Sequence, residues 1–183
     1  MSFASLGGGL LAGASRWALP AAIVLAVATV VRLGLTANAA GWAVVQLLLV
    51  AVAACDLATR RIPNALTASG ALLAVCARAA FERGALTEVV VAGAACLLAF
   101  GVFSLAVRGG LGMGDVKLAG LLGFLLGSAV VPALLIGTLA GSFAAIVLLA
   151  ARRATARSSI AYGPYLAFGA AVAILGFHPP PIL

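Results

Sequence analysis

The sequence predicts an all-α membrane protein, a polytopic bundle of six to seven transmembrane helices. Of its 183 residues, 65% are hydrophobic and only 8% are charged, whereas a soluble domain is usually about a quarter charged. A soluble fold of this length has too little interior to hide so much apolar surface. The apolar runs are also unbroken, whereas the strands of a membrane barrel alternate over roughly ten residues.

Seven apolar segments are expected to form helices. They are Trp17–Leu35, Ala40–Ala58, Ala65–Ala80, Leu86–Val107, Asp115–Ser128, Val130–Ala151 and Ile160–Phe177. A helix needs about 20 residues to cross the hydrocarbon. The third and fifth segments are shorter, so we expect them to be tilted or to begin below the bilayer surface.

The first two segments meet near Ala37-Asn38-Ala39. Arg16, an apolar stretch and these small residues are similar to a secretory signal with its cleavage site, but Arg32 interrupts that pattern. We therefore favour a first transmembrane helix. Its removal would leave six spans in the same orientation.

Local signals set the boundaries of the other helices. Pro63 is expected to end the second helix and Asn64 to cap the start of the third. Glu82 and Glu88, before and within the fourth segment, are interpreted as solvated loop charges. Pro164 suits the first turn of the last helix, where a missing N–H costs nothing, although it could also leave backbone groups free to line a substrate groove.

The basic residues predict one orientation in the membrane. With the N-terminus in the cytoplasm, eight fall inside and three outside, as the positive-inside rule requires. The inside set is Arg16, Arg60, Arg61, Arg108, Lys117, Arg152, Arg153 and Arg157, and the outside set is Arg32, Arg78 and Arg83. This rule also explains the net charge of +7 better than nucleic-acid binding does, because basic and aromatic residues are not interleaved.

The cysteines and the histidine argue against a metal or thiol site. Cys55, Cys76 and Cys96 all lie in apolar stretches without a C-x-x-C pair, so we interpret them as small packing residues. The single histidine, His178, lies beyond the last span, too far for a Cys/His dyad. We expect no metal and no cofactor.

Two of the four acidic residues, Asp56 and Asp115, lie where solubility does not explain them. The predicted topology places both at the cytoplasmic ends of their helices, on the same face. An ionisable group at membrane depth is costly, so its default interpretation is functional. Two carboxyl groups that share one proton are the apparatus of aspartyl proteolysis, in which one activates water and the other polarises the carbonyl.

Each aspartate also has a structural interpretation. Asp56 could pair with Arg60 one turn later, and Asp115 could cap its helix. Gly112 and Gly114 would leave room for an extended peptide beside Asp115. Lys117 could tune the protonation of the two aspartates or bind a lipid phosphate.

Three stretches combine these residues: Asp56-x-x-x-Arg60-Arg61-Ile62-Pro63-Asn64, Gly112-Met113-Gly114-Asp115-Val116-Lys117-Leu118 and Tyr162-Gly163-Pro164-Tyr165-Leu166-Ala167-x-Gly169. In this order and spacing they resemble the type IV prepilin peptidase family, membrane aspartyl proteases of bacteria. The G-x-G-D-x-K element is the most specific of the three.

The resemblance implies a function and a site. It implies that Asp56 and Asp115 are the catalytic pair and that Gly112, Gly114, Lys117, Gly163 and Pro164 bind substrate or shape the site. The substrate would be a prepilin or pseudopilin, cut at the cytoplasmic face of the inner membrane, with lipid as the other partner.

The resemblance also indicates which form of the family this is. The chain lacks the cysteine pairs of longer members and is similar to the short, peptidase-only form of tight-adherence (Flp-type) pili. Residues 1–39 would be an added N-terminal segment with the first transmembrane helix, and residues 40–178 the peptidase-like membrane domain.

Two other function classes remain open at this point. Membrane carboxylates also serve as proton relays, so a proton-coupled transporter component is one alternative. An inactive scaffold for pilus assembly is the other. The absence of charge from the central thirds of the spans disfavours the first, and the presence of both aspartates disfavours the second.

Overall fold

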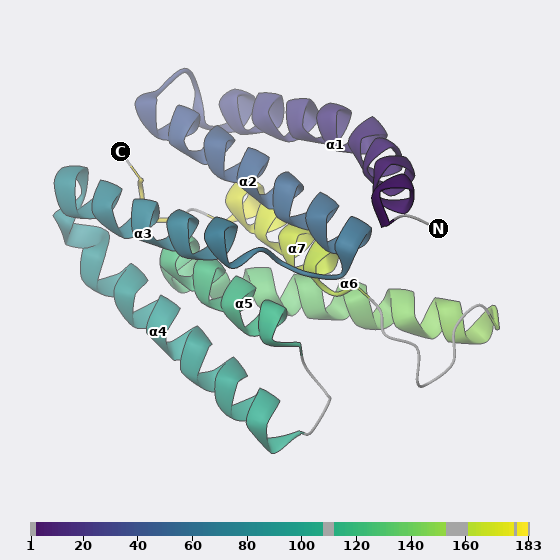
Figure 1. The fold of residues 1–183 in the computed structure, drawn as a ribbon. Helices are drawn as coiled ribbons and strands as arrows, with labels where there is room; N and C mark the ends of the chain where they lie inside the picture. Colours follow the sequence, from purple (N-terminus) through teal and green to yellow (C-terminus); the bar gives the residue numbers. More distant parts are fainter. Residues whose placement is uncertain (1–2, 108–111, 153–160, 178, 183) are drawn as a thin grey trace.

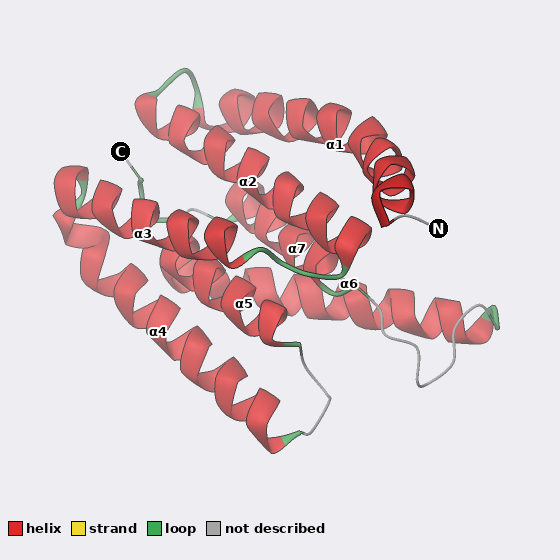
Figure 2. Ribbon diagram, in the orientation of Figure 1, coloured by secondary structure: helices red, strands yellow, loops and turns green. Residues whose placement is uncertain are grey.

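Helices account for every regular element in the part of the chain that the structure, a computed structural model, describes (Figures 1 and 2). The described residues are 3–107, 112–152, 161–177 and 179–182, with side chains from residue 17 onward. The elements are α1 (Phe3–Leu33), α2 (Ala37–Thr59), α3 (Asn64–Phe81), α4 (Arg83–Ala106), α5 (Met113–Leu126), the short 3₁₀ helix η1 (Gly127–Ala129), α6 (Val130–Ala150) and α7 (Gly163–Gly176).

The seven predicted helices are confirmed, with shifted ends. The largest shift is in α1, which begins at Phe3 rather than Trp17 and carries Pro20 inside it. Ala37–Ala39, the stretch similar to a cleavage site, forms the first turn of α2, where the Thr36 side chain accepts the amide of Ala39 at 3.1 Å. The fifth segment ends at Leu126, because Gly127 has a positive φ of 56° and opens η1.

The fold is a membrane helix bundle, as predicted. Among the described residues, four stretches are long and apolar enough to cross a membrane: α2, α3, α4 and the continuous stretch Met113–Ala150. Trp17–Leu33 and α7 are shorter apolar helices. Since α7 has 14 residues, it is roughly 21 Å long, less than the roughly 30 Å of hydrocarbon. One of its ends must therefore lie below the membrane surface.

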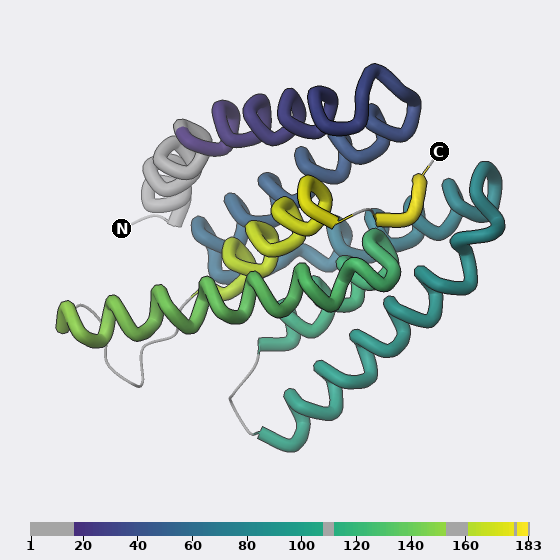
Figure 3. The backbone as a smooth tube through the Cα atoms, turned by 180° about the vertical axis from the view of Figure 1, so that it is seen from behind, coloured from purple at the N-terminus to yellow at the C-terminus, as the bar shows by residue number. Residues whose placement is uncertain are grey.

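Helix α5 is the buried centre of the bundle. Most of its length is covered, with α4, α3 and α7 packed around it. Its side chains join the core formed by α2 and α7, including Trp42, Leu49, Leu166 and Ile174. Helix α1 lies along α2 on the outside of this core, and α6 runs against α7, as the view from behind shows (Figure 3).

The end of α5 at Leu126 is closed by a buried arginine. Arg78 of α3 was counted among the outside charges, yet its side chain is fully buried. Its guanidinium donates to the carbonyls of Leu125 at 2.6 Å, Phe124 at 3.4 Å and Pro180 at 3.2 Å. These carbonyls include two that the last turn of a helix leaves without a partner, and they carry the negative end of its dipole. Arg78 is therefore a structural clamp.

Glu88 also contributes to the region at the end of α5. It lies inside α4, and its carboxylate accepts the backbone N–H of Ser128 at 2.7 Å. Arg32, another residue of the outside set, donates from Nε to the carbonyl of Leu175 at 2.7 Å. Glu88 is exposed, as expected, but it lies in a helix rather than in a loop, and the turn after α5 presents an amide within its reach.

Candidate active site

Asp56 lies in the last turn of α2, and the end of that helix positions it. The helix ends at Thr59, where Arg60 adopts a left-handed conformation with φ 53° and donates its amide to the Asp56 carbonyl at 2.7 Å. Pro63 was expected to end this helix, but the chain leaves helical geometry three residues earlier. The Asp56 side chain is only 6% exposed.

The start of α3 supplies a second wall of the site. Pro63 occupies the N-cap position without a side-chain cap, so the expectation that Asn64 is the cap is wrong. Asn64 is the first residue of the helix, and its Oδ1 accepts a hydrogen bond from Lys117 Nζ at 2.8 Å. This bond joins the start of α3 to the first turns of α5.

Asp115 lies in the first turn of α5, three residues after the N-cap Gly112. It is therefore not the cap itself. From this third position a carboxylate reaches back to the N-cap amide, as in a capping box, and Asp115 interacts with the Gly112 amide in this way. A Cβ atom added at Gly112 would lie 3.3 Å from Oδ2 of Asp115.

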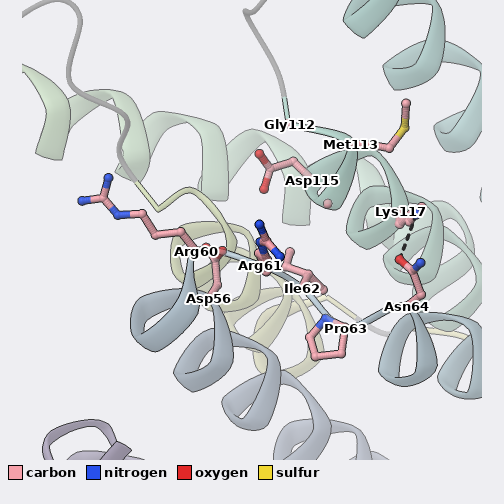
Figure 4. A pocket seen from close by; sticks show the side chains of 11 residues that line it. Asp56, Arg60, Arg61, Ile62, Pro63, Asn64, Gly112, Met113, Asp115 and Lys117 are labelled. Atoms are coloured by element: carbon pink, nitrogen blue, oxygen red, sulfur yellow. Dashed lines mark hydrogen bonds between the residues drawn. The ribbon is translucent and has the colours of Figure 1, made fainter. Parts of the chain in front are cut away.

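The two aspartates line one pocket of about 460 Å³ (Figure 4). Its walls come from the end of α2, the turn before α3 and the start of α5. They are Asp56, Arg60, Arg61, Ile62, Pro63, Asn64, Gly112, Met113, Gly114, Asp115 and Lys117. In Figure 4 the carboxylates of Asp56 and Asp115 reach the same hollow from different helices. The predicted juxtaposition of two acids distant in sequence is thus present.

A third helix, α7, also holds Asp56. The backbone N–H of Gly163, the first residue of α7, donates to Asp56 Oδ2 at 2.9 Å in a buried bond. Gly163 and Pro164 are not among the residues that line the pocket. Pro164 occupies the first turn of α7, as its sequence predicted.

Acidic and basic side chains line the pocket together. Two acids and three basic side chains, Arg60, Arg61 and Lys117, line the same space. The charge of Asp56 acts on Asp115, and that of Arg60 acts on Asp56. Two neighbouring carboxyls with one proton between them can take a proton from water with one group and give a proton to a carbonyl with the other.

The structure brings together most of the predicted site residues and adds others. Asp56, Asp115, Gly112, Gly114 and Lys117 share the pocket. Gly109 and Gly110, two further glycines that precede Asp115 and could also leave room for a peptide, lie outside the described residues, as does His178. Sequence reasoning missed the contribution of Ile62, Met113 and Asn64 to the pocket walls, since apolar and turn residues carry no chemical signal of their own.

Comparison with known proteins identifies a family whose matched region includes this pocket. A model of the type IV leader peptidase family matches residues 43–151, more than half of the chain. Comparison with curated proteins and with solved structures found no match. The matched residues include both acids of the pocket, Asp56 and Asp115. The chain is a membrane peptidase that belongs to the type IV leader peptidase family.

Proposed function

We propose that the protein is an aspartyl endopeptidase that removes the leader peptide of type IV prepilins or pseudopilins, with Asp56 and Asp115 as its catalytic pair. The observation that carries the proposal is the shared pocket, in which both carboxyls line one space although they come from different helices. The family supplies the class of reaction, leader peptide hydrolysis.

The reaction needs only the two carboxyl groups and water. The ionised carboxylate takes a proton from water while the water oxygen attacks the peptide carbonyl carbon. The protonated carboxyl gives its proton to the carbonyl oxygen. The tetrahedral intermediate then collapses. Its C–N bond breaks, the nitrogen receives a proton from the first carboxyl, and the second carboxyl recovers its proton from the hydroxyl group.

The location of the pocket suits a substrate that is itself a membrane helix. The pocket lies where α2 ends and α5 begins, beside the cationic side chains of Arg60 and Arg61. The positive-inside rule puts such residues on the cytoplasmic side of the bacterial inner membrane. A prepilin has its leader there, just before its hydrophobic helix. Flp-type prepilins are the proposed substrates, because the chain is similar to the short form of the family.

Replacing either aspartate by asparagine tests the proposal. We expect Asp56→Asn and Asp115→Asn each to lower the rate of leader removal by about 1000-fold, since a positioned acid or base contributes roughly 100- to 10,000-fold. Leader removal is measured with purified enzyme and an Flp-type prepilin in lipid vesicles, by mass spectrometry of the product. A pseudopilin in a parallel assay defines the substrate range.

Glu82→Gln is the matched control, because it also neutralises an acid but lies between α3 and α4, at the other end of α3 from the pocket. It should cleave at the rate of the unmodified enzyme. All three variants should unfold at the same denaturant concentration as the parent. Normal processing by either aspartate variant would refute the assignment.

A further inference from the structure

The first turn of α7 has one amide free to bind outside its own helix. The amides of Tyr165 and Leu166 donate to the carbonyl of Tyr162 at 3.1 and 3.2 Å. Pro164 has no N–H. The amide of Gly163 remains, and it donates to Asp56 Oδ2. Asp56 therefore accepts a hydrogen bond from the one first-turn amide that α7 does not use itself. This amide lies at the N-terminus of α7, the positive end of the helix dipole.

A side chain at position 163 would collide with Asp56. A Cβ there would lie 2.7 Å from Asp56 Oδ2, 3.1 Å from Cγ and 3.2 Å from Cβ. Contacts this short require the aspartate to move, because the glycine lies in a helix whose backbone is fixed by packing. The absence of a side chain and the hydrogen bond thus act together on the same carboxylate.

The start of α7 is itself held firmly by α6. A Cβ at Gly141 would lie 2.7 Å from the Tyr162 ring, and one at Gly137 would lie 2.9 Å from the Tyr165 carbonyl, so the two helices pack at close range. The Tyr162 hydroxyl donates to the Thr138 carbonyl at 3.3 Å. At the other end of α7, Arg32 binds the carbonyl of Leu175. The helix has little freedom to slide or tilt.

We propose that Gly163 is a positioning residue of the peptidase, whose amide fixes Oδ2 of Asp56 and leaves Oδ1 as the oxygen that takes a proton from water. The inference rests on the proposed function for the pairing of Asp56 with Asp115, and it adds that Asp56 is the carboxylate that takes the proton, because the Gly163 amide favours its charged form. It concerns a residue beyond the matched range 43–151. Gly163 donates to Asp56 and does not line the pocket, so it acts through the aspartate and not on the substrate.

Two alanine variants in the same helix test the proposal. Gly163→Ala displaces Asp56, and we expect kcat to fall about 100-fold with KM nearly unchanged, the effect of a catalytic group displaced by about an ångström. Gly176→Ala is the control, because a Cβ there has nothing within 4 Å. Its kcat should equal that of the parent. A Gly163→Ala enzyme that folds and keeps the parent kcat overturns the proposal.

The pH profile separates positioning from a simple loss of folded protein. An N–H donated to a carboxylate favours its charged form. Its loss in Gly163→Ala should move the acid limb of the rate profile to higher pH, whereas partial misfolding lowers the rate equally at every pH. Pro164→Ala is the second variant for this test if Gly163→Ala does not fold. It adds an amide at the same helix end, so its acid limb should move to lower pH, and an unmoved limb overturns the proposal.

An infrared titration of the purified protein gives the same test without substrate. The carboxyl band of Asp56 is assigned by its loss in Asp56→Asn, and its protonation midpoint is followed in each alanine variant. A midpoint raised in Gly163→Ala and unchanged in Gly176→Ala supports positioning even if the parent cleaves no prepilin, an outcome that would refute only the proposed function. Equal midpoints in the two variants refute positioning.

Discussion

The two ends of helix α5 carry buried charge in opposite ways. At its start, Asp115 lies at the edge of a pocket that it shares with a second acid, Asp56. At its end, the fully buried Arg78 is surrounded by carbonyl acceptors from α5 and from Pro180, with the Trp42 ring centre 6.0 Å from its guanidinium carbon. The first end brings like charges together beside open space. The second end pairs its charge with fixed dipoles and with the opposite charge of Glu88.

The difference shows how stability and chemistry are divided within one short helix. Hydrogen bonds from a charged group to buried carbonyls stabilise the fold by roughly 1.5–3 kcal/mol each. Two carboxyls in one pocket gain nothing for stability from each other, because like charges repel. The arginine end therefore holds α5 in place, while the aspartate end borders an open pocket.

The largest effect on stability is expected from Arg78→Ala. It leaves the last carbonyls of α5 buried without a donor, and we expect the free energy of unfolding to fall by about 3 kcal/mol. Reversible denaturation in detergent micelles measures it. Arg83→Ala is the matched control, because Arg83 is exposed and donates to the carbonyl of Ala79, in its own neighbourhood of the chain, at 3.1 Å. If both substitutions lower the free energy of unfolding equally, Arg78 does not act as a structural clamp.

A pair of glycines within α5 sharpens the comparison. A Cβ at Gly123 would lie 2.7 Å from the Ala92 carbonyl of α4, whereas one at Gly114 would make ordinary contact with Ile62 at 3.6 Å. We expect Gly123→Ala to lower the free energy of unfolding by about 2 kcal/mol through overpacking. Gly114→Ala should change it by less than about 1 kcal/mol, since alanine favours the helix. Equal losses would show that both ends are packed alike.

The smallest effect is expected from the Lys117–Asn64 hydrogen bond, which connects α5 to α3 beside the pocket. Because the bond is exposed, Lys117→Met and Asn64→Ala should each cost about 0.5 kcal/mol. A double-mutant cycle should give a coupling free energy of similar size. A coupling as large as the Arg78 effect would mean that the open end is fastened as firmly as the closed one.

The sequence was sufficient for the helices and for the meeting of the two acids. Long apolar runs require helices in a membrane, and the alternation of spans places the end of the second and the start of the fifth at one side. The exact boundaries were less predictable. Arg60 ends α2 in a left-handed conformation that arginine rarely adopts, so Pro63 was the stronger signal in the sequence.

The roles of Arg78, Glu88 and Gly163 could not be obtained from sequence alone. Each depends on a hydrogen bond between a side chain and a backbone group that are far apart in the chain, such as Arg78 with the Leu125 carbonyl, Glu88 with the Ser128 amide, and Asp56 with the Gly163 amide. Backbone groups are the same at every residue, so no spacing of side chains identifies them. Only the packing of α3 and α4 on α5 brings these partners together.

The bond between Asp56 and Gly163 spans 107 positions of the chain. Membrane proteins are synthesised from the N-terminus, so both acids enter the bilayer before the last helix leaves the ribosome. Until α7 inserts, Asp56 lacks the amide that orients it. A nascent or truncated chain without α7 would thus hold both acids of the proposed catalytic pair and, under the proposed function, would remain a poor protease.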